Sequence, residues 1–385
     1  MNDAHGDGAT VARVPLHVIA REWGRLGVIG FGGPPAHIAL LRRLSVEQNP
    51  WLSAEEFEHA VTATSLLPGP ASTQLVIYAA WRLRGARGAL LGGLCFIAPG
   101  LCLIIALSAL FFARHPSSGV LGAALGAGAA VPAIAARTAW QLGAPSWRQR
   151  RGAGLRARAF VYCVLGAVVT LVAPSLVVLV LLTCGAAEVV ARRGVRHGFV
   201  AGFAATHPVA LGAWGALGWV AFKVGALSYG GGFVIVPLMQ HDVVATYHWM
   251  SGTQFLNAVA LGQITPGPVV LTVSAVGYAV HGLSGAALAT VVAFAPSFLL
   301  IIAGARFFDR LRTDPSVASF LAGAGPSVIG AIGASSVTLA MLLTHPWQWG
   351  LLAMASMWTL VLRRGTTSLL VVAGVAGALI TLAVS

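Results

Sequence analysis

Long apolar blocks separated by short basic stretches divide this chain, and they constrain its fold more than any other feature. Each block holds about 15 to 25 residues, the length that a helix needs to cross a hydrocarbon layer roughly 30 Å thick. Only 9% of the residues are charged, against about 25% in a soluble domain, so polar groups are too few to cover a soluble surface. Isolated strands in lipid would leave backbone groups unpaired. The sequence therefore predicts an all-α polytopic membrane protein whose main partner is the lipid bilayer.

The basic residues lie mostly between the apolar blocks. A net charge of +13 would suggest a nucleic-acid partner in a soluble protein. Cationic loops also hold membrane helices in orientation, and this explanation fits the positions of the arginines, so we expect no nucleic acid. The four cysteines and eleven histidines show no metal-ligand spacing. We therefore expect neither a metal nor a cofactor.

The chain contains an internal repeat with an offset of 198 residues. Between residues 27–70 and 225–268, 13 of 44 ungapped positions are identical, and further on the offset falls to 197. The repeat predicts two related domains, residues 1–197 and 198–385. The matching stretches are LGVIGFGG (26–33) with VGALSYGG (224–231), WLSAEEFEHAV (51–61) with WMSGTQFLNAV (249–259), and LPGP (67–70) with TPGP (265–268).

Each half has the same series of apolar segments, and the second segment of each is interrupted by Pro-Gly-Pro. In the first half the segments lie near 16–40, 55–80, 88–112, 119–141, 159–173 and 175–191. In the second half they lie near 208–238, 255–279, 286–305, 316–343, 347–362 and 366–384. We expect each interrupted segment to be re-entrant, returning to its own side of the membrane, so that each half makes about five spans.

The arginines indicate how the two halves face. Arg82, Arg84 and Arg87 form a basic loop in the first half, whereas the matching loop of the second half has only His281. With five crossings in each half, the second half enters the membrane upside down, and most basic residues then lie on the cytoplasmic side. A parallel duplication is the alternative, and it would put about half of the basic loops on the wrong face. We therefore expect two inverted-topology repeats, as in many secondary transporters.

The two Pro-Gly-Pro motifs are the main candidates for a transport site. Each removes two backbone donors and separates two half-helices, and the free N–H groups at a helix start attract anions. Broken helices at matching places of two repeats indicate a binding site; a simple proline kink is the alternative. The candidate substrate-binding residues are Pro68, Gly69 and Pro70 with Ser65, Thr73 and Gln74 in the first half, and Pro266, Gly267 and Pro268 with Asn257, Gln263 and Thr265 in the second.

Two cations inside apolar segments are further candidates. Arg25 and Lys223 match at the 198-residue offset, and an ionised side chain inside a span usually faces a partner or a wet cavity. A dianionic substrate would supply that partner. Snorkelling to the membrane surface, or pairing of Arg25 with Glu22, is the alternative. The glycine pairs that follow permit close backbone approach, for helix packing or for a ligand: Gly32 and Gly33, and Gly230 and Gly231.

Four stretches around these glycine pairs and Pro-Gly-Pro motifs are informative in combination: FGGPPAHIALL, LLPGPASTQL, SYGGGFVIVPLMQ and QITPGPVVLT. They resemble the chromate ion transporter family in its long, two-domain form. The resemblance implies a secondary transporter in the bacterial plasma membrane that exports chromate, an oxyanion dianion, and confers chromate resistance. Transport of sulfate or another oxyanion, also inward, and assembly as a homodimer stay open. A membrane-embedded enzyme is disfavoured, because the chain has no Asp-rich motif.

Overall fold

The structure, a computed structural model, describes residues 14–113, 115–150, 152–193, 212–228, 235–304, 314–362 and 365–384. Every regular element in these ranges is helical. Seven helices of this described part are long and apolar enough to cross a membrane: Ala71–Phe111, Ser118–Arg148, Ala153–Val172, Pro174–Arg192, Val269–Gly304, Pro315–Ala340 and Thr366–Ala383. The prediction of an all-α polytopic membrane protein is confirmed.

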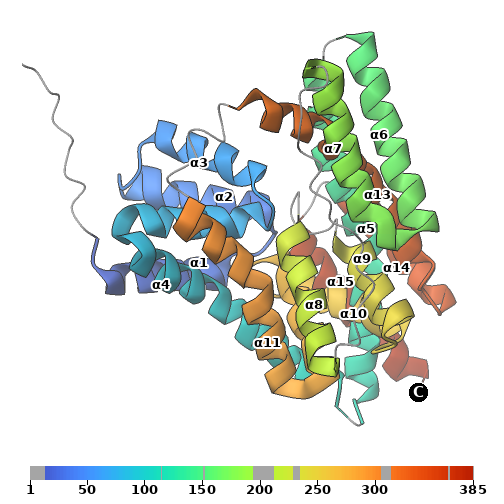
Figure 1. Ribbon diagram of the computed structural model, residues 1–385. Coiled ribbons are helices and arrows are strands. Elements are labelled where there is room, and N and C mark those ends of the chain that lie inside the picture. Colours follow the sequence, from blue (N-terminus) through green and yellow to red (C-terminus); the bar gives the residue numbers. More distant parts are fainter. Residues whose placement is uncertain are drawn as a thin grey trace, which may run out of the picture.

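The helices of the two halves follow one another in a similar order (Figure 1). The first half forms α1 (Leu16–Ile29), α2 (Pro34–Arg42), the π-helical η1 (Arg43–Gln48), α3 (Ala54–Leu66), α4 (Ala71–Phe111), α5 (Ser118–Gln149), α6 (Ala153–Val172), the 3-10 turn η2 (Pro174–Leu176) and α7 (Val177–Arg193). The second half forms α8 (Ala213–Leu227), α9 (Ile235–Gln240), the π-helical η3 (His241–Thr246), α10 (Gly252–Ile264), the 3-10 turn η4 (Val269–Leu271), α11 (Thr272–Gly304), α13 (Pro315–Ala340), α14 (Pro346–Ser356), the π-helical η6 (Met357–Val361) and α15 (Thr366–Val384).

The first predicted span, residues 16–40, is not continuous. It is divided between α1 and α2, because Gly32 and Gly33 adopt positive φ angles of 101° and 73°, a region that glycine enters at little cost. Pro34 then starts α2, where its fixed φ suits the first helical position. The prediction of one span was wrong here, since the GGPP sequence ends one helix and begins another.

The repeat extends to local geometry. α4 and α11 each fold back on themselves at one pair of residues, with φ/ψ of −145°/24° at Arg84 and 58°/−149° at Gly85. The corresponding angles are −137°/24° at His281 and 60°/−145° at Gly282. α3 and α10 both have 13 residues, and both begin with a capping box. In this arrangement the serine just before the helix and the third helical residue exchange hydrogen bonds.

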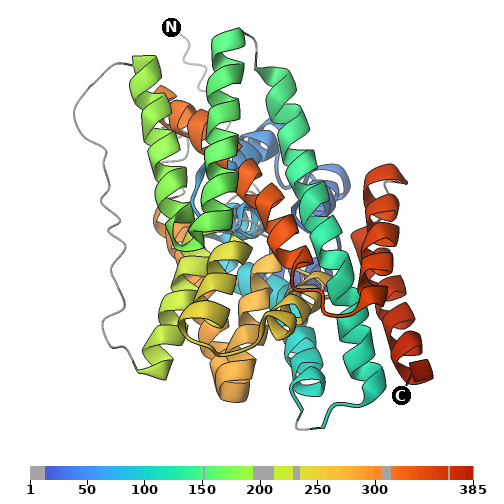
Figure 2. The same ribbon diagram turned by 90° about the vertical axis from the view of Figure 1, so that its right-hand side faces the viewer.

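The two halves exchange helix partners. α5 of the first half packs against α14 and α15, whereas α13 of the second half packs against α6 and α7 (Figures 1 and 2). Glycines allow these helices to approach closely: Gly126 of α5 faces the backbone of Gly377, and Gly330 of α13 faces the carbonyl group of Cys163. Small residues at helix contacts are the usual means of tight packing in membranes.

The Pro-Gly-Pro turns lie where the halves meet. The turn of the second half packs against Gly100 of α4, and the N–H of Gly267 donates a hydrogen bond of 2.9 Å to the carbonyl oxygen of Gly30. The turn of the first half lies beside α8 and α11, where Gly69 faces Ser297 and the carbonyl oxygen of Gly225. Each Pro-Gly-Pro turn therefore packs against the folded-back helix of the opposite half, which is α11 for the first turn and α4 for the second.

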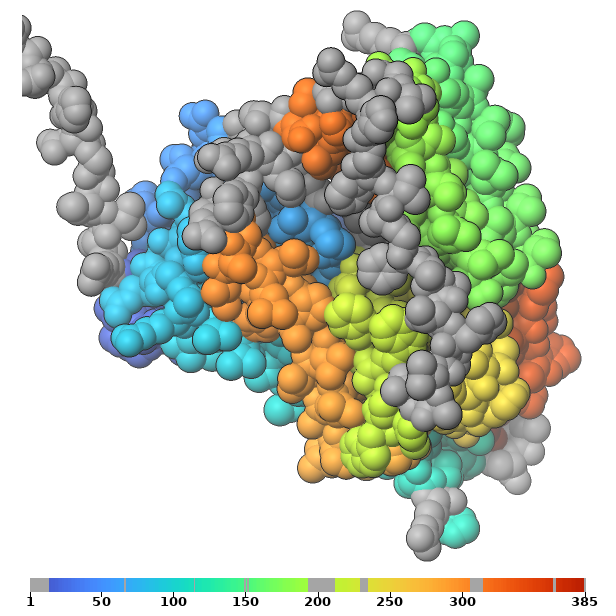
Figure 3. All heavy atoms as spheres, in the orientation of Figure 1, coloured from blue at the N-terminus to red at the C-terminus, as the bar shows by residue number. Residues whose placement is uncertain are grey.

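The outer helices show the surface expected in lipid. Large apolar side chains such as Phe160, Val172 and Leu379 are more than half exposed, as on a face that contacts acyl chains. In Figure 3, α6 and α7 (green) form one edge of the molecule and the first helices (blue and cyan) form the opposite edge. The carboxylate of Glu188 joins α6 to α7 through Arg158, at 3.0 Å.

Candidate functional site: a polar cavity between the halves

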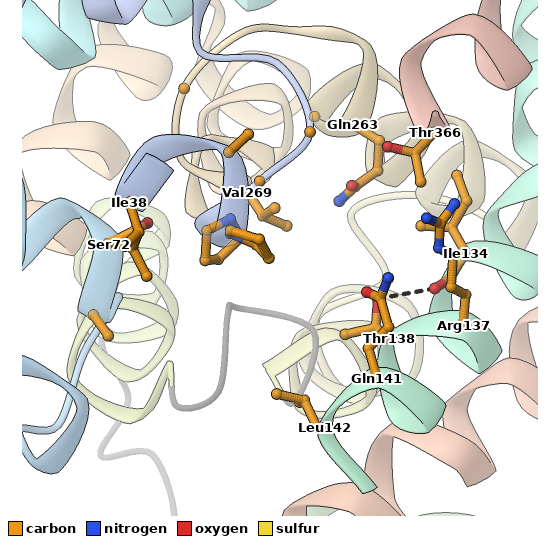
Figure 4. Close-up of a pocket in the computed structure, with 18 of the residues that line it drawn as sticks. Ile38, Ser72, Ile134, Arg137, Thr138, Gln141, Leu142, Gln263, Val269 and Thr366 are labelled. Carbon is orange, nitrogen blue, oxygen red and sulfur yellow. Dashed lines mark hydrogen bonds between the residues drawn. The ribbon is translucent and has the colours of Figure 1, made fainter. Parts of the chain in front are cut away.

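A cavity of about 670 Å³ lies between the two halves. It is bounded by the glycine break before α2, the Pro-Gly-Pro regions, α5 and the start of α15, so both halves contribute to its wall (Figure 4). Hydroxyl, amide and guanidinium groups are spaced along an otherwise apolar lining. The polar lining residues are Ser65, Ser72, Arg137, Thr138, Gln141, Gln263, Thr265 and Thr366.

Four helices begin at this cavity. The first residues of α2, of α4, of η4 leading into α11, and of α15 all line it. A helix start carries a partial positive charge and usually unpaired N–H groups, and it stabilises a nearby anion by roughly 0.3–1 kcal/mol. α2 contributes the partial charge alone, because it begins with two prolines and its next two N–H groups donate to the carbonyl oxygen of Gly33. The ends of α3 and α10 also reach the wall, through Ser65 and Gln263. Helix starts outnumber helix ends, which favours negative charge in the cavity.

Arg137 is the one charged side chain among the described residues that line the cavity. α5 carries it, together with Thr138 and Gln141, on the face turned toward the cavity (Figure 4). The guanidinium group lies on the same side as Gln263 and Thr366, across the space from Ser72. A guanidinium group offers five donors in a planar fork, which suits an oxyanion.

His37 holds the first break in shape behind the cavity wall. Its ring is buried, with Nε2 2.9 Å from the carbonyl oxygen of Gly30 and Nδ1 3.2 Å from the hydroxyl oxygen of Ser72. A carbonyl oxygen only accepts hydrogen bonds, so Nε2 donates, and in the neutral ring Nδ1 accepts from the hydroxyl group. Because Gly30 also accepts from Gly267, one carbonyl group links α1, α2 and the second Pro-Gly-Pro turn.

The chain matches the family described as Chromate transporter over residues 18–189 and 215–381. It belongs to the chromate transporter family. It is 33% identical to a chromate transport protein of Cupriavidus metallidurans over 349 residues, covering 88% of this chain and 86% of that protein. It is 30% identical to a probable chromate transport protein of Synechococcus elongatus, covering 92% of each chain. It is 31% identical to a chromate transport protein of Pseudomonas aeruginosa, covering 82% of this chain and 79% of that protein. No solved structure matches the chain.

Apart from Arg25 and Lys223, the candidate residues of this chromate transporter family member fall into three groups. Gly32, Gly33, Ser65, Gln263, Thr265 and Gly267 line the cavity. Pro68, Gly69, Pro70, Thr73, Gln74, Asn257, Pro266 and Pro268 do not line it; apart from Pro68 they are buried beside or behind its wall. Gly230 and Gly231 lie outside the described residues. The structure thus brings together at one cavity residues from both Pro-Gly-Pro regions and from the first glycine pair.

The two predicted cations lie elsewhere. The ammonium group of Lys223 is 2.5 Å from a carboxylate oxygen of Asp242, and both side chains are largely buried, 18% and 9% exposed. Arg25 is exposed and borders a separate cavity of about 120 Å³, which Glu22 and Arg43 also line. The carboxylate of Glu22 pairs with Arg21. Lys223 therefore has its opposing charge within the protein, and its contact with substrate stays a prediction.

Sequence reasoning did not single out Arg137. It lies near the end of the predicted span 119–141, where it looks like one more basic residue at a loop. Its counterpart at the 197-residue offset is Ala334, so the comparison of the two halves did not mark it either. The signal that was available is the cluster of Arg137, Thr138 and Gln141 at helical spacing, which puts three polar groups on one face of an Ala-rich helix.

Proposed function

We propose that this chain is a secondary transporter that exports chromate across the bacterial plasma membrane and thereby confers chromate resistance. The observation that carries the proposal is the cavity between the halves, with Arg137 on one wall and four helix starts around it. Membership of the family indicates chromate as the substrate, and the relatives described above are named as chromate transport proteins. A transporter needs such a polar chamber between its repeats.

The chemistry of the lining suits a tetrahedral dianion. Chromate has four oxygen atoms that accept hydrogen bonds and two negative charges. Arg137 supplies a positive charge and directed donors, while the amide groups of Gln141 and Gln263 and the hydroxyl group of Thr366 supply further donors. Among the described lining residues there is no carboxylate to repel the anion. The same groups would accept sulfate, which is the main alternative substrate.

An inverted arrangement of the two halves, 1–197 and 198–385, is part of this proposal. Gly93 of α4 packs against Phe298 of α11, and Ala89 and Ile301 share a small buried cluster. Both contacts join the arm of α4 that follows Gly85 to the corresponding arm of α11, which follows Gly282. Going back along α4 from one contact to the other means going forward along α11, so the two arms run in opposite directions. Opposed equivalent helices support repeats related by an axis in the membrane plane, each with a Pro-Gly-Pro segment that is re-entrant.

The membrane potential supplies a direction. A cell interior that is negative favours outward movement of an anion by about 2.3 kcal/mol per charge for each 100 mV. A dianion that crosses alone therefore gains roughly 4.6 kcal/mol per 100 mV when it leaves the cell. The membrane potential therefore favours export of the anion. Coupling to a further ion would change the size of this free-energy gain.

Vesicles of known orientation test the proposal. Everted membrane vesicles that contain the protein should accumulate radiolabelled chromate when their interior is made positive, and vesicles without it should not. Excess unlabelled sulfate should reduce the uptake if the two dianions share the cavity. Absence of chromate uptake, with labelled sulfate taken up instead, would replace chromate by sulfate as substrate. Uptake only by right-side-out vesicles with a positive interior would reverse the proposed direction.

A further inference from the structure

A second, smaller cavity lies in the first half, between α1 and the segment formed by α2 and η1; we call it the α1–η1 cavity. Its volume of about 120 Å³ holds several water molecules and therefore has room for a phosphate group. α1 and α2 lie on the opposite side of the molecule from α6 and α7 (Figure 1). The α1–η1 cavity shares no lining residue with the larger cavity between the halves, so it is a separate site.

Two arginines without partners border the α1–η1 cavity. Arg25 comes from α1, and Arg43 is the first residue of η1. Within the described part of the chain, neither guanidinium group takes part in an ion pair or a hydrogen bond. The one carboxylate among the described lining residues belongs to Glu22, and it pairs with Arg21 at 2.8 Å. Two cations that border one small space repel each other, and an anion in that space would stabilise both.

The second half solves the same electrostatic problem within the chain. At the 198-residue offset, Lys223 corresponds to Arg25, and Asp242 corresponds to Leu44. The ammonium group of Lys223 lies 2.5 Å from a carboxylate oxygen of Asp242. In the first half Leu44 lines the α1–η1 cavity and offers no charge. Both halves therefore have a cation at this place, but in the first half the anion that pairs with it has to come from outside the chain.

Charged side chains in contact with water lie next to the α1–η1 cavity. Arg42, which directly precedes Arg43, forms ion pairs with Glu47, at 3.8 Å, and with Glu58. The side chains of these three residues are 45% to 59% exposed. Because such exposed charges are costly inside a hydrocarbon layer, this end of α2 and η1 lies at the membrane surface.

Apolar side chains suited to lipid lie on the other side of Arg25. Val28 and Ile29 are 54% and 44% exposed, and they follow Arg25 by three and four residues, which puts all three on one face of α1. Ile29 also lines the α1–η1 cavity. A charged cavity continued by exposed apolar side chains matches a phospholipid, in which a charged phosphate group adjoins acyl chains.

We propose that the α1–η1 cavity binds the phosphate group of an anionic phospholipid, through the guanidinium groups of Arg25 and Arg43 and the amide group of Gln48. An acyl chain would lie along Val28 and Ile29. Basic pockets between membrane helices bind anionic headgroups. The lining has two unpaired arginines and one carboxylate that is already paired, which selects a lipid with net negative charge. The bound lipid would tie α1 to η1 across the glycine break between α1 and α2.

The test uses the purified full-length protein in detergent without chromate, so that its outcome does not depend on the proposed function. Phosphatidylglycerol is the probe, and phosphatidylcholine is the comparison lipid without net charge. Native mass spectrometry should detect one phosphatidylglycerol molecule per chain that stays bound at collision energies that remove phosphatidylcholine. Phosphatidylglycerol should also raise the melting temperature, because a ligand that binds only the folded state stabilises it.

Three variants and one control locate the binding site. Arg25→Gln and Arg43→Gln should each raise the dissociation constant for phosphatidylglycerol about tenfold, because each removes charged donors to the phosphate group. Leu44→Asp should have a similar effect, because it adds to the cavity the carboxylate that the second half already has. Arg87→Gln is the matched control, since it removes the same charge from an exposed arginine that does not line the cavity.

Each outcome decides the proposal. Equal retention of phosphatidylcholine would overturn the selection for negative charge, and an effect of Arg25→Gln and Arg43→Gln no larger than that of Arg87→Gln would overturn the site. A rise in melting temperature with inorganic phosphate alone, abolished by Arg25→Gln, would assign the cavity to a free oxyanion in place of a lipid. If Leu44→Asp folds poorly, the two glutamine variants still decide, because Arg25 and Arg43 are exposed. Binding of phosphatidylglycerol without chromate transport would reject only the proposed function.

Discussion

Replacing Arg137 by glutamine tests the cavity as the chromate site. Glutamine keeps two donors on a shorter side chain and removes the charge and the planar fork. A hydrogen bond to a charged group contributes about 1.5–3 kcal/mol, and about 1.4 kcal/mol corresponds to a factor of ten in affinity. Arg137 is only partly buried, so water screens part of its interaction with the anion. We therefore expect chromate affinity to fall about 10- to 100-fold.

The assay is the initial rate of chromate uptake into everted vesicles over a range of chromate concentrations. Arg137→Gln should raise KM, and Arg137→Lys, which keeps the charge without the fork, should give an intermediate value. Arg21→Gln is the control, because the Arg21 side chain is 75% exposed and pairs with Glu22 away from the cavity. A wild-type KM in Arg137→Gln, at equal protein levels, would refute the assignment of the cavity as the chromate site.

Three further substitutions test the packing and the buried charges, each through the apparent melting temperature of the protein in detergent. Gly225→Ala should destabilise the fold by about 1–3 kcal/mol, because its new methyl group would overlap the backbone of α11. Lys223→Met should cost about 3–5 kcal/mol by leaving Asp242 buried without its partner. Glu188→Gln should cost about 1–3 kcal/mol, because a buried carboxylate that binds two arginines is lost.

Each of these has a matched comparison. Gly218→Ala meets no atom within 4 Å and should leave stability unchanged; an equal loss in both glycine variants would contradict the packing argument. Lys223→Met combined with Asp242→Asn should recover most of the lost stability and transport. Failure of the double variant to transport, despite a restored melting temperature, would favour the substrate contact predicted for Lys223. Glu55→Gln, at an exposed carboxylate, should have no effect.

Much of the architecture follows from local sequence signals. The Pro-Gly-Pro motifs mark breaks because proline has no N–H and glycine accepts positive φ, and Gly69 and Gly267 have φ of 117° and 97°. The turn between the arms of α4 was located because the basic loop of Arg82, Arg84 and Arg87 separates the apolar segments 55–80 and 88–112. The GGPP break was missed because the apolar pattern continues through it, and hydrophobicity alone does not register a change in backbone direction.

The candidate site was only partly predictable. Residues next to the Pro-Gly-Pro motifs were found because the motif itself places them at helix starts and ends. Arg137 comes from a helix outside the repeated motifs, and its position depends on the packing of α5 against the second half. The partner of Lys223 was equally hidden, because Asp242 corresponds to Leu44 in the first half and only the folded chain brings the two charges together.

The exchange of partners between the halves has an evolutionary consequence. A helix that presents Gly100 or Gly126 to the opposite half cannot acquire a larger residue there unless the facing backbone retreats. Residues such as Gly100 and Pro266, or Gly126 and Gly377, which lie 166 and 251 positions apart in the sequence, must then change in concert, as residues at the interface of two subunits do. An ancestor with a single half would have exposed these glycine faces unless a second copy covered them.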